Sequence, residues 1–143
     1  MLEIWCEIPG YEDLYMASTR GRVRSMERLG ADGRLLKGGV KKMSLNTGGY
    51  LMTVLTKERK RKLYQVHQLI AMAFLGHKPN GHKVVCDHIN NVRTDNRLEN
   101  LQLISQRENC SKDKKGGTSE HIGVCWYGSR KKWRANITMP SGK

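Results

Sequence analysis

The chain has 143 residues, which suits one ordinary domain or two to three small modules and excludes a large multidomain enzyme. It carries 26 Lys and Arg against 13 Asp and Glu, a formal net charge of +13, so a polyanion such as nucleic acid is the expected partner. Its four cysteines include no C-x-x-C pair, which argues against a structural zinc site. No apolar run is long enough for a membrane span, and no signal peptide is present, so reduced thiols in the cytoplasm are expected.

The positive charge is unevenly distributed along the chain. Residues 14–62 hold 13 Lys and Arg against 3 Asp and Glu, and residues 112–143 hold 8 against 2. Residues 63–111, with 5 against 4, are nearly neutral. Cationic segments on both sides of a neutral centre suit a phosphate backbone bound through counterion release, with chemistry between the contacts. Charge alone does not distinguish such a protein from one that is only soluble and basic.

The first 25 residues predict a small antiparallel sheet. Apolar and polar positions alternate around a turn at Pro9-Gly10 and a second turn at residues 18–21. Arg22 and Arg24 are two residues apart, so they fall on the same face of a strand and could follow a backbone or reach a groove.

A hairpin and a helix are predicted next. Residues 50–56 and 62–66 form the two strands, and the cationic turn 57–61 is either solvated or a phosphate contact. Apolar residues in residues 66–74 recur at helical spacing, and Gly76 ends the helix. His67 falls on the polar side of this stripe, where capping or packing is favoured over catalysis.

A strand–loop–strand–helix unit follows. Residues 83–86 predict a strand that runs into Asp87-His88, residues 89–99 a polar loop, and residues 100–104 the return strand. Ser105-Gln-Arg-Glu108 has the S-x-x-E capping pattern, which places Asn109 one turn inside a helix. Residues 112–119 form a Lys, Gly and Ser linker, and a new alternating segment begins at residue 121.

This unit brings together residue types suited to hydrolysing a phosphodiester. Asp87 and the side-chain carbonyl of Asn109, 22 residues later, offer oxygen ligands of the kind that Mg²⁺ prefers. A neutral His88 can take a proton from water, while a metal ion offsets charge on the phosphoryl oxygens. Asn100 could tie down the loop or hold the imidazole in one tautomer. Alternatively, Asp87, Asn96 and Asn100 are ordinary turn-forming residues.

Several segments together resemble a known family. Residues 66–74 (VHQLIAMAF), 85–89 (VCDHI), 95–102 (DNRLENLQ) and 105–109 (SQREN) resemble the HNH homing endonucleases of phage introns and intergenic sites. Glu3–Glu12 with residues 21–25 resembles the DNA-binding module that commonly precedes that nuclease domain. Residues 121–126 and 132–137, with Gly142-Lys143, are similar to the opening strands of the three-stranded DNA-binding domain of plant ethylene-response factors.

The resemblance implies an α+β chain with three modules. A small antiparallel-sheet DNA-binding module spans residues 1–46, an HNH nuclease domain spans 47–115 with its ββα-metal core at about 83–113, and a partial three-stranded-sheet module spans 116–143. That last module stops at Lys143, before the final strand and helix of the related domain, so it is expected to be truncated or to continue beyond this sequence. The loop reads Asn90-Asn91 where Asp-Gly is common, and both asparagines tolerate tight turns.

For the site, the resemblance implies a single Mg²⁺ (or Mn²⁺) held by Asp87 and Asn109. His88 would be the general base and Asn100 the residue that orders the loop. Family members leave 5′-phosphate and 3′-hydroxyl ends, and several nick one strand. The expected protein is a monomer acting on double-stranded DNA in the cytoplasm of a bacterial host, and encoded by a phage.

The modules also nominate residues for contact with DNA, each of which could equally be a solvated surface group. The candidates are Arg22, Arg24, Lys41, Lys42, Lys57, Arg59, Lys60, Arg61, Lys62, Arg130, Lys131, Lys132 and Arg134. Trp5, Trp126 and Trp133 are expected to anchor small cores and not to stack on bases.

The leading hypothesis is a metal-dependent, site-specific DNA endonuclease that nicks its target. One rival is a DNA-binding protein with an inactive HNH centre that acts by occupying its site; the intact set Asp87, His88, Asn100 and Asn109 argues against it. A second rival, a basic structural protein of a nucleoprotein particle, explains the charge but not these residues.

Overall fold

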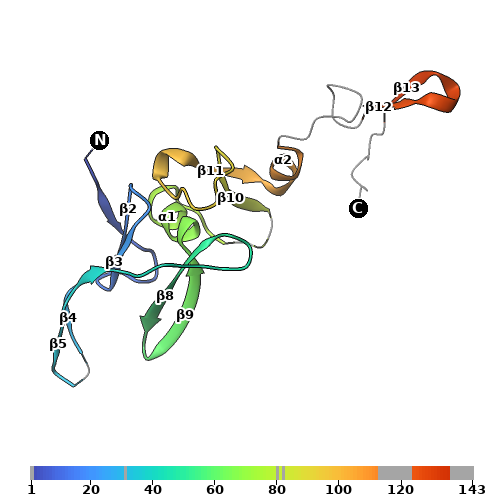
Figure 1. Cartoon of the computed structure of the whole chain (residues 1–143). Coiled ribbons are helices and arrows are strands. Elements are labelled where there is room, and N and C mark those ends of the chain that lie inside the picture. Colours follow the sequence, from blue (N-terminus) through green and yellow to red (C-terminus); the bar gives the residue numbers. More distant parts are fainter. Residues whose placement is uncertain (1, 31, 80, 82, 113–123, 136–143) are drawn as a thin grey trace, which may run out of the picture. The chain divides into compact units, whose positions relative to one another are not determined.

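The computed structural model describes residues 2–30, 32–79, 81, 83–112 and 124–135. They form short antiparallel strands with a few short helices, in two compact units, Met1–Ser105 and Gln106–Lys143 (Figure 1). The predicted α+β class is confirmed. Among the described residues, no helix is both long enough and apolar enough to span a bilayer.

An antiparallel sheet forms near the N-terminus, as predicted. Its strand order is β1 (Trp5–Glu7), β2 (Tyr15–Ser18), β3 (Val23–Ser25), β6 (Gly39–Val40). Between β3 and β6 the chain makes a hairpin of β4 (Arg28–Leu29) and β5 (Leu35–Leu36) that the sequence did not predict. These strands are two residues long, too short for an alternating pattern to be recognised.

The predicted central hairpin and helix are confirmed. The hairpin joins β8 (Leu51–Lys57) to β9 (Lys60–Gln65), and β7 (Ser44–Leu45) pairs with the outer edge of β8. Glu58 and Arg59 both have positive φ, 50° and 61°, as a tight two-residue hairpin turn requires. The helix α1 (Val66–Phe74) follows β9 directly.

One hydrophobic core serves the whole of the first unit. Three residues of the α1 stripe, Val66, Leu69 and Ile70, are fully buried. They pack with residues from the N-terminal sheet and the turn after β1, from β8 and from β11: Ile8, Tyr15, Ala17, Val23, Leu55 and Leu101. Because strands this small cannot form separate cores, the N-terminal sheet and the segment after it are stabilised by the same helix.

The strand–loop–strand unit consists of β10 (Val84–His88) and β11 (Leu101–Ser105), with a 3₁₀ turn η1 (Leu98–Asn100) before β11. Two predicted boundaries were wrong by one or two residues. Asp87 and His88 do not leave β10 but end it, since they pair with Gln102 and Leu101. Asn100 does not start β11 but ends the η1 turn.

The second unit contains α2 (Gln106–Ser111), in which Asn109 is the fourth residue, and a hairpin of β12 (Val124–Tyr127), the 3₁₀ turn η2 (Gly128–Arg130) and β13 (Lys132–Ala135). Trp126 and Trp133 face each other across the hairpin, with ring centroids 5.3 Å apart. They are 45% and 53% exposed, so among the described residues they are not the predicted core anchors. Residues 113–123 and 136–143 of the predicted third module lie outside the described residues.

Candidate active site

The His88 imidazole is buried and bonds to a side chain of the loop that follows it. It ends β10, is 5% exposed, and its Nε2 lies 3.0 Å from Oδ1 of Asn96. An amide oxygen can only accept, so Nε2–H donates. In that tautomer Nδ1 is the nitrogen that can accept a proton, the arrangement a general base needs. The sequence suggested Asn96 only as a turn residue.

Two aromatic side chains pack around this imidazole. His67 lies 4.9 Å from His88 and 5.2 Å from Tyr50, centroid to centroid, and Tyr50 lies 6.1 Å from His88. Of the two roles left open for His67, packing is the one observed. Its predicted place on the polar side of α1 was wrong, because it is 4% exposed. Tyr50 had no distinguishing signal in the sequence.

Burial keeps His67 neutral. Loss of solvation lowers the pKa of His67 from 6.5 to about 4, with smaller contributions from His88 and His77. At neutral pH His67 therefore adds no positive charge beside His88. It supplies an uncharged aromatic ring beside the His88 imidazole.

Because His67 is buried and neutral, we expect the free energy of unfolding to fall as the pH is lowered. Between pH 6.5 and 4 the unfolded state protonates residue 67 and the native state does not, so acid favours unfolding. We expect a loss of about 2 kcal/mol in unfolding free energy between pH 7 and pH 5 from this group. Urea titrations at both pH values should show a smaller loss for His67→Phe; equal losses in the two proteins would contradict the prediction. His77, whose pKa burial also lowers, contributes in the same direction in both.

Asn100 organises the loop that follows His88. Its amide Nδ2 donates to Oδ1 of Asn90 at 2.9 Å and to the carbonyl of Asp95 at 2.7 Å, while its Oδ1 accepts from the Asn90 backbone N–H at 3.0 Å. Asn91 has φ of 62°, a conformation that asparagine tolerates. Of the two roles considered for Asn100, these contacts support loop ordering, since the imidazole bonds to Asn96.

A compact ion pair closes the same loop. Arg97 contacts both carboxylate oxygens of Asp95 at 2.8 Å and lowers the pKa of that carboxyl well below its usual range. A bidentate pair of this kind adds geometric definition more than net stability, because it is near the surface. It flanks Asn96 on both sides.

Asp87 is oriented by the opposite strand. Its Oδ2 accepts a hydrogen bond of 2.9 Å from Nε2 of Gln102, the residue directly across from it in β11. Among the described residues no three His, Cys, Asp or Glu side chains gather into a metal cage. Asn109 belongs to the second unit, and its sharing of an ion with Asp87 stays a prediction.

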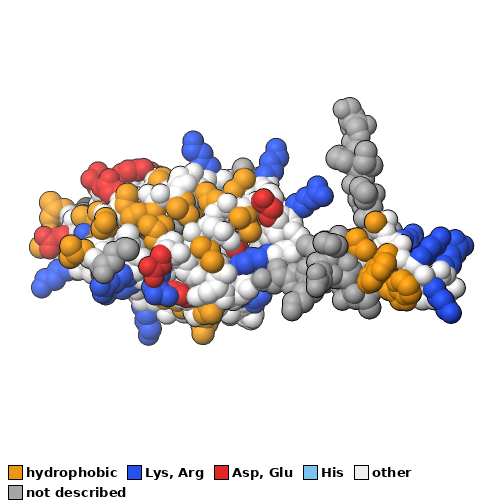
Figure 2. All heavy atoms as spheres, turned by 90° about the horizontal axis from the view of Figure 1, so that it is seen from above, with side chains coloured by type: hydrophobic (Ala, Val, Ile, Leu, Met, Phe, Trp, Pro, Cys, Tyr) orange, Lys and Arg blue, Asp and Glu red, His pale blue; other side chains and the backbone are white. Residues whose placement is uncertain are grey.

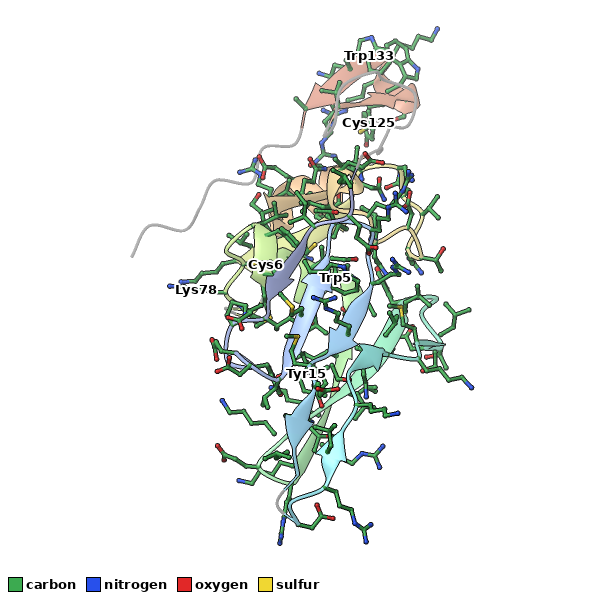
Figure 3. All side chains as sticks on the ribbon, turned by 90° about the vertical axis from the view of Figure 1, so that its left-hand side faces the viewer. Trp5, Cys6, Tyr15, Lys78, Cys125 and Trp133 are labelled. Carbon is green, nitrogen blue, oxygen red and sulfur yellow. The ribbon has the colours of Figure 1, made fainter. Side chains whose placement is uncertain are left out.

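The two arginines of the N-terminal sheet do share a face, but both have partners. Arg22 forms a hydrogen-bonded ion pair with Glu3, which lowers the pKa of Glu3 to about 2. The guanidinium of Arg24 lies 4.4 Å from the centre of the Trp5 ring, which rests on this sheet (Figure 3). Trp5 thus packs against cations and not in the core.

The other candidate DNA contacts are mostly exposed. Lys57 donates to the carbonyl of Gly10 at 2.8 Å, Lys62 lies 4.9 Å from the Tyr64 ring, and Lys41 lies 5.8 Å from the Tyr15 ring. Figure 2 shows Lys and Arg side chains projecting from the surface of both units. The remaining candidates are exposed: Lys42, Arg59, Lys60, Arg61, Arg130, Lys131, Lys132 and Arg134.

The β10–β11 hairpin, with a buried histidine at its end and an ordered loop after it, is a candidate nuclease centre, and comparison with known proteins identifies the class. Residues 3–56 match the NUMOD4 motif, and residues 64–110 match the HNH endonuclease family. The chain belongs to the HNH endonucleases.

Individual relatives are viral. An HNH endonuclease of Acanthamoeba polyphaga mimivirus, L247, is 36% identical over 110 residues, which cover 75% of this chain and 25% of the relative. The DNA endonuclease I-HmuI of Bacillus phage SP01 is 32% identical over 114 residues, 80% of this chain and 59% of that protein. A solved structure of DNA binding and cleavage by I-HmuI matches with a TM-score of 0.60 and 30% identity, over 76% of this chain and 56% of that one. The chain thus spans less than two thirds of each relative.

Proposed function

We propose that this protein is a metal-dependent DNA endonuclease of the homing type, in which His88 is the general base. The observation that carries the proposal is the buried imidazole beside Asp87, whose Nε2–H donates to Asn96. In that tautomer Nδ1 is the nitrogen that would take the proton. The family supports the same function, and the intact Asp87, His88, Asn100 and Asn109 favour it over an inactive centre.

His88 would act on a water molecule next to the scissile phosphate. Nδ1 takes a proton from the water as its oxygen bonds to phosphorus, and the bond from phosphorus to the 3′ oxygen breaks. The 3′ oxygen gains a proton from solvent, so the products are a 5′-phosphate and a 3′-hydroxyl. His88 then releases its proton, and the cycle closes. A monomer has one such centre, which suits nicking of one strand.

The residues present fit a hard divalent cation. Asp87 offers a carboxylate oriented by Gln102, and Asn109 offers a neutral oxygen, so Mg²⁺ or Mn²⁺ is the expected ion, as a single ion. When bound, it would offset charge on the phosphoryl and leaving oxygens. Asn100 bonds to the carbonyl of Asp95, next to Asn96, so its ordering of the loop would keep the hydrogen-bond partner of His88 in place.

The exposed cations supply the proposed affinity for double-stranded DNA. The β8–β9 turn, with Arg59, Lys60 and Arg61, and the η2–β13 segment, residues 130–134, are dense in positive charge. Such groups bind phosphates without reading sequence, and they position the duplex for cutting. Viral relatives favour a phage gene whose product acts in the cytoplasm of a bacterial host.

A plasmid selection tests the function without knowledge of the target. The protein is incubated with Mg²⁺ and a supercoiled library carrying random inserts, and nicked or linear circles are isolated and sequenced. We expect open circles enriched in one insert sequence, with 5′-phosphate and 3′-hydroxyl ends. Enrichment of bound but uncut plasmids alone would instead support the rival that acts by occupancy.

A further inference from the structure

We propose that the β2–β3 turn of the N-terminal sheet, residues 18–22, is a positioning part of the nuclease centre. Through Gly21 this turn sets the place of Asn96, and through Asn96 it orients the His88 imidazole. The N-terminal sheet would then do more than hold DNA. This inference rests on the proposed role of His88 as the base.

The turn and the loop of the nuclease centre are joined backbone to backbone. The N–H of Leu98 donates to the carbonyl of Thr19 at 2.9 Å. The turn itself is closed by three hydrogen bonds with Ser18. The Gly21 N–H donates to the Ser18 carbonyl at 3.0 Å, the Arg22 N–H donates to the Ser18 Oγ at 3.1 Å, and the Ser18 N–H donates to the Arg22 carbonyl at 2.8 Å. Because the turn is closed and bonded to the loop, it fixes the position of the loop relative to the N-terminal sheet.

Gly21 makes the closest approach in this junction. It is buried and has φ of +76°, and a Cβ placed on it would lie 2.7 Å from both the carbonyl carbon and the oxygen of Asn96. Ordinary contact begins at about 3.4 Å, so a side chain here would force the two backbones apart by several tenths of an ångström. Only glycine allows the turn to reach Asn96.

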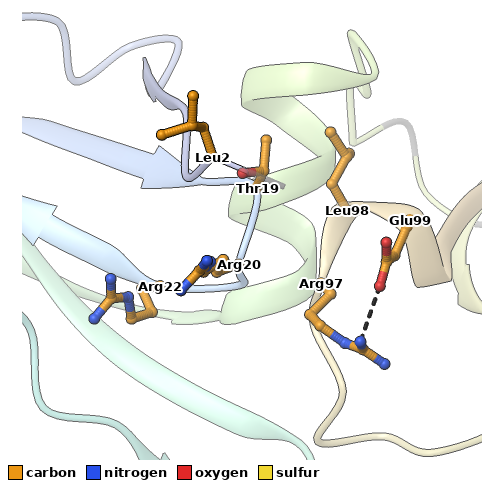
Figure 4. Close-up of a pocket in the computed structure, with 7 residues that line it drawn as sticks. All are labelled: Leu2, Thr19, Arg20, Arg22, Arg97, Leu98 and Glu99. Carbon is orange, nitrogen blue, oxygen red and sulfur yellow. Dashed lines mark ion pairs between the residues drawn. The ribbon is translucent and has the colours of Figure 1, made fainter.

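The hollow beside this junction is lined from both sides. Thr19, Arg20 and Arg22 come from the turn, and Arg97, Leu98 and Glu99 come from the loop and η1 (Figure 4). In the close-up the turn carrying Arg20 runs next to the segment carrying Arg97 and Leu98. The Leu98–Thr19 backbone hydrogen bond crosses between the same two segments.

Asn96 has little means of absorbing a displacement. Its side chain is buried and its Oδ1 accepts from His88, while its buried Nδ2 has no hydrogen-bond partner among the residues that the structure describes. Within that part of the chain, the contact with His88 is therefore the hydrogen bond that orients the amide. A shift of several tenths of an ångström would lengthen the 3.0 Å bond to His88 and loosen the choice of tautomer.

A matched pair of glycine substitutions separates this contact from backbone strain. Gly21→Ala and Gly10→Ala both put alanine at positive φ, +76° and +83°, in turns of the same sheet, but a Cβ at residue 10 meets nothing within 4 Å. We expect both variants to bind the selected plasmid insert with wild-type Kd. The single-turnover cleavage rate of Gly21→Ala should fall about 10- to 100-fold below that of Gly10→Ala, as displacement of a catalytic group does.

A second measurement reads the imidazole directly and does not need cleavage. With ¹⁵N-labelled histidine at pH 8, wild type and Gly10→Ala should show His88 protonated at Nε2, and Gly21→Ala should show a mixture of tautomers. Asn96→Ala should give the same mixture, whereas Asn96→Asp, which keeps an acceptor oxygen, should restore the Nε2–H form. If Gly21→Ala fails to fold, the two Asn96 variants carry the test.

The outcomes distinguish this inference from the proposed function. If wild type does not cut DNA but Gly21→Ala still perturbs the tautomer, the function fails and the positioning role stands. If Gly21→Ala cuts as fast as Gly10→Ala with an unchanged tautomer, the positioning role is overturned. An unchanged tautomer in Asn96→Ala overturns it as well.

Discussion

His88→Ala is expected to abolish DNA cleavage while leaving DNA binding unchanged. The imidazole is buried and donates Nε2–H to Asn96, so it is not part of the exposed cationic surface. Loss of a positioned general base typically costs 10²- to 10⁴-fold in rate. The single-turnover rate of nicking on the selected plasmid should fall by that factor, with a Kd within about twofold of wild type in a mobility shift.

His77→Ala is the matched control. His77 is also a buried histidine, 7% exposed against 5% for His88, but it lies in the loop after α1 and has no role in the proposed chemistry. It should cut at close to the wild-type rate. Cleavage by His88→Ala at the rate of the His77 variant would mean that another group is the base.

Removal of the metal ion or of its carboxylate ligand is expected to have an effect of similar size. EDTA should stop nicking and added Mg²⁺ should restore it, because the charge that builds on the phosphate would otherwise be unopposed. Loss of a residue that only supports a metal ligand typically weakens metal binding 10- to 100-fold. Asp87→Ala removes a proposed ligand itself, so the Mg²⁺ concentration that gives half-maximal rate should rise by more than that. Stopped-assay rates across a Mg²⁺ series measure both effects.

Asp32→Ala controls for the loss of one negative charge. Asp32 is 60% exposed at its side chain and pairs with Arg34 in the β4–β5 hairpin, away from β10. Its Mg²⁺ dependence should match that of wild type. If EDTA leaves cutting unchanged, the metal assignment is wrong; if the Asp87 and Asp32 variants respond alike, Asp87 is not a ligand.

Much of the local structure could be predicted because it follows from short-range patterns. The stripe in residues 66–74 predicts α1, because a helix must bury one face, and Val66, Leu69 and Ile70 are fully buried. Alternating apolar and polar residues on both sides of the turn at residues 57–61 predict β8 and β9, because a strand places successive side chains on opposite faces. Errors appear at element ends, as at Asp87 and His88, where pairing with another strand and not local preference sets the boundary.

The chemical identity of the centre was also present in the sequence. Asp87 and His88 are adjacent, and Asn100 lies within the following loop, so their proximity in the first unit needs no long-range folding. Residue type and spacing were therefore enough to nominate a base and a metal ligand. The charge of the cationic turns was enough to predict that they are exposed. It could not show that Arg22 forms an ion pair with Glu3.

The helix, the main strands, the charge and the Asp-His pair could be read from the chain, because each depends on residues that are neighbours in sequence. The surroundings of the imidazole required the folded molecule: Tyr50 and His67 come from other elements, and Gly21 approaches Asn96 across 75 residues of chain. Contacts between distant segments arise only when one shared core brings them together, and no local pattern encodes which backbone will approach which.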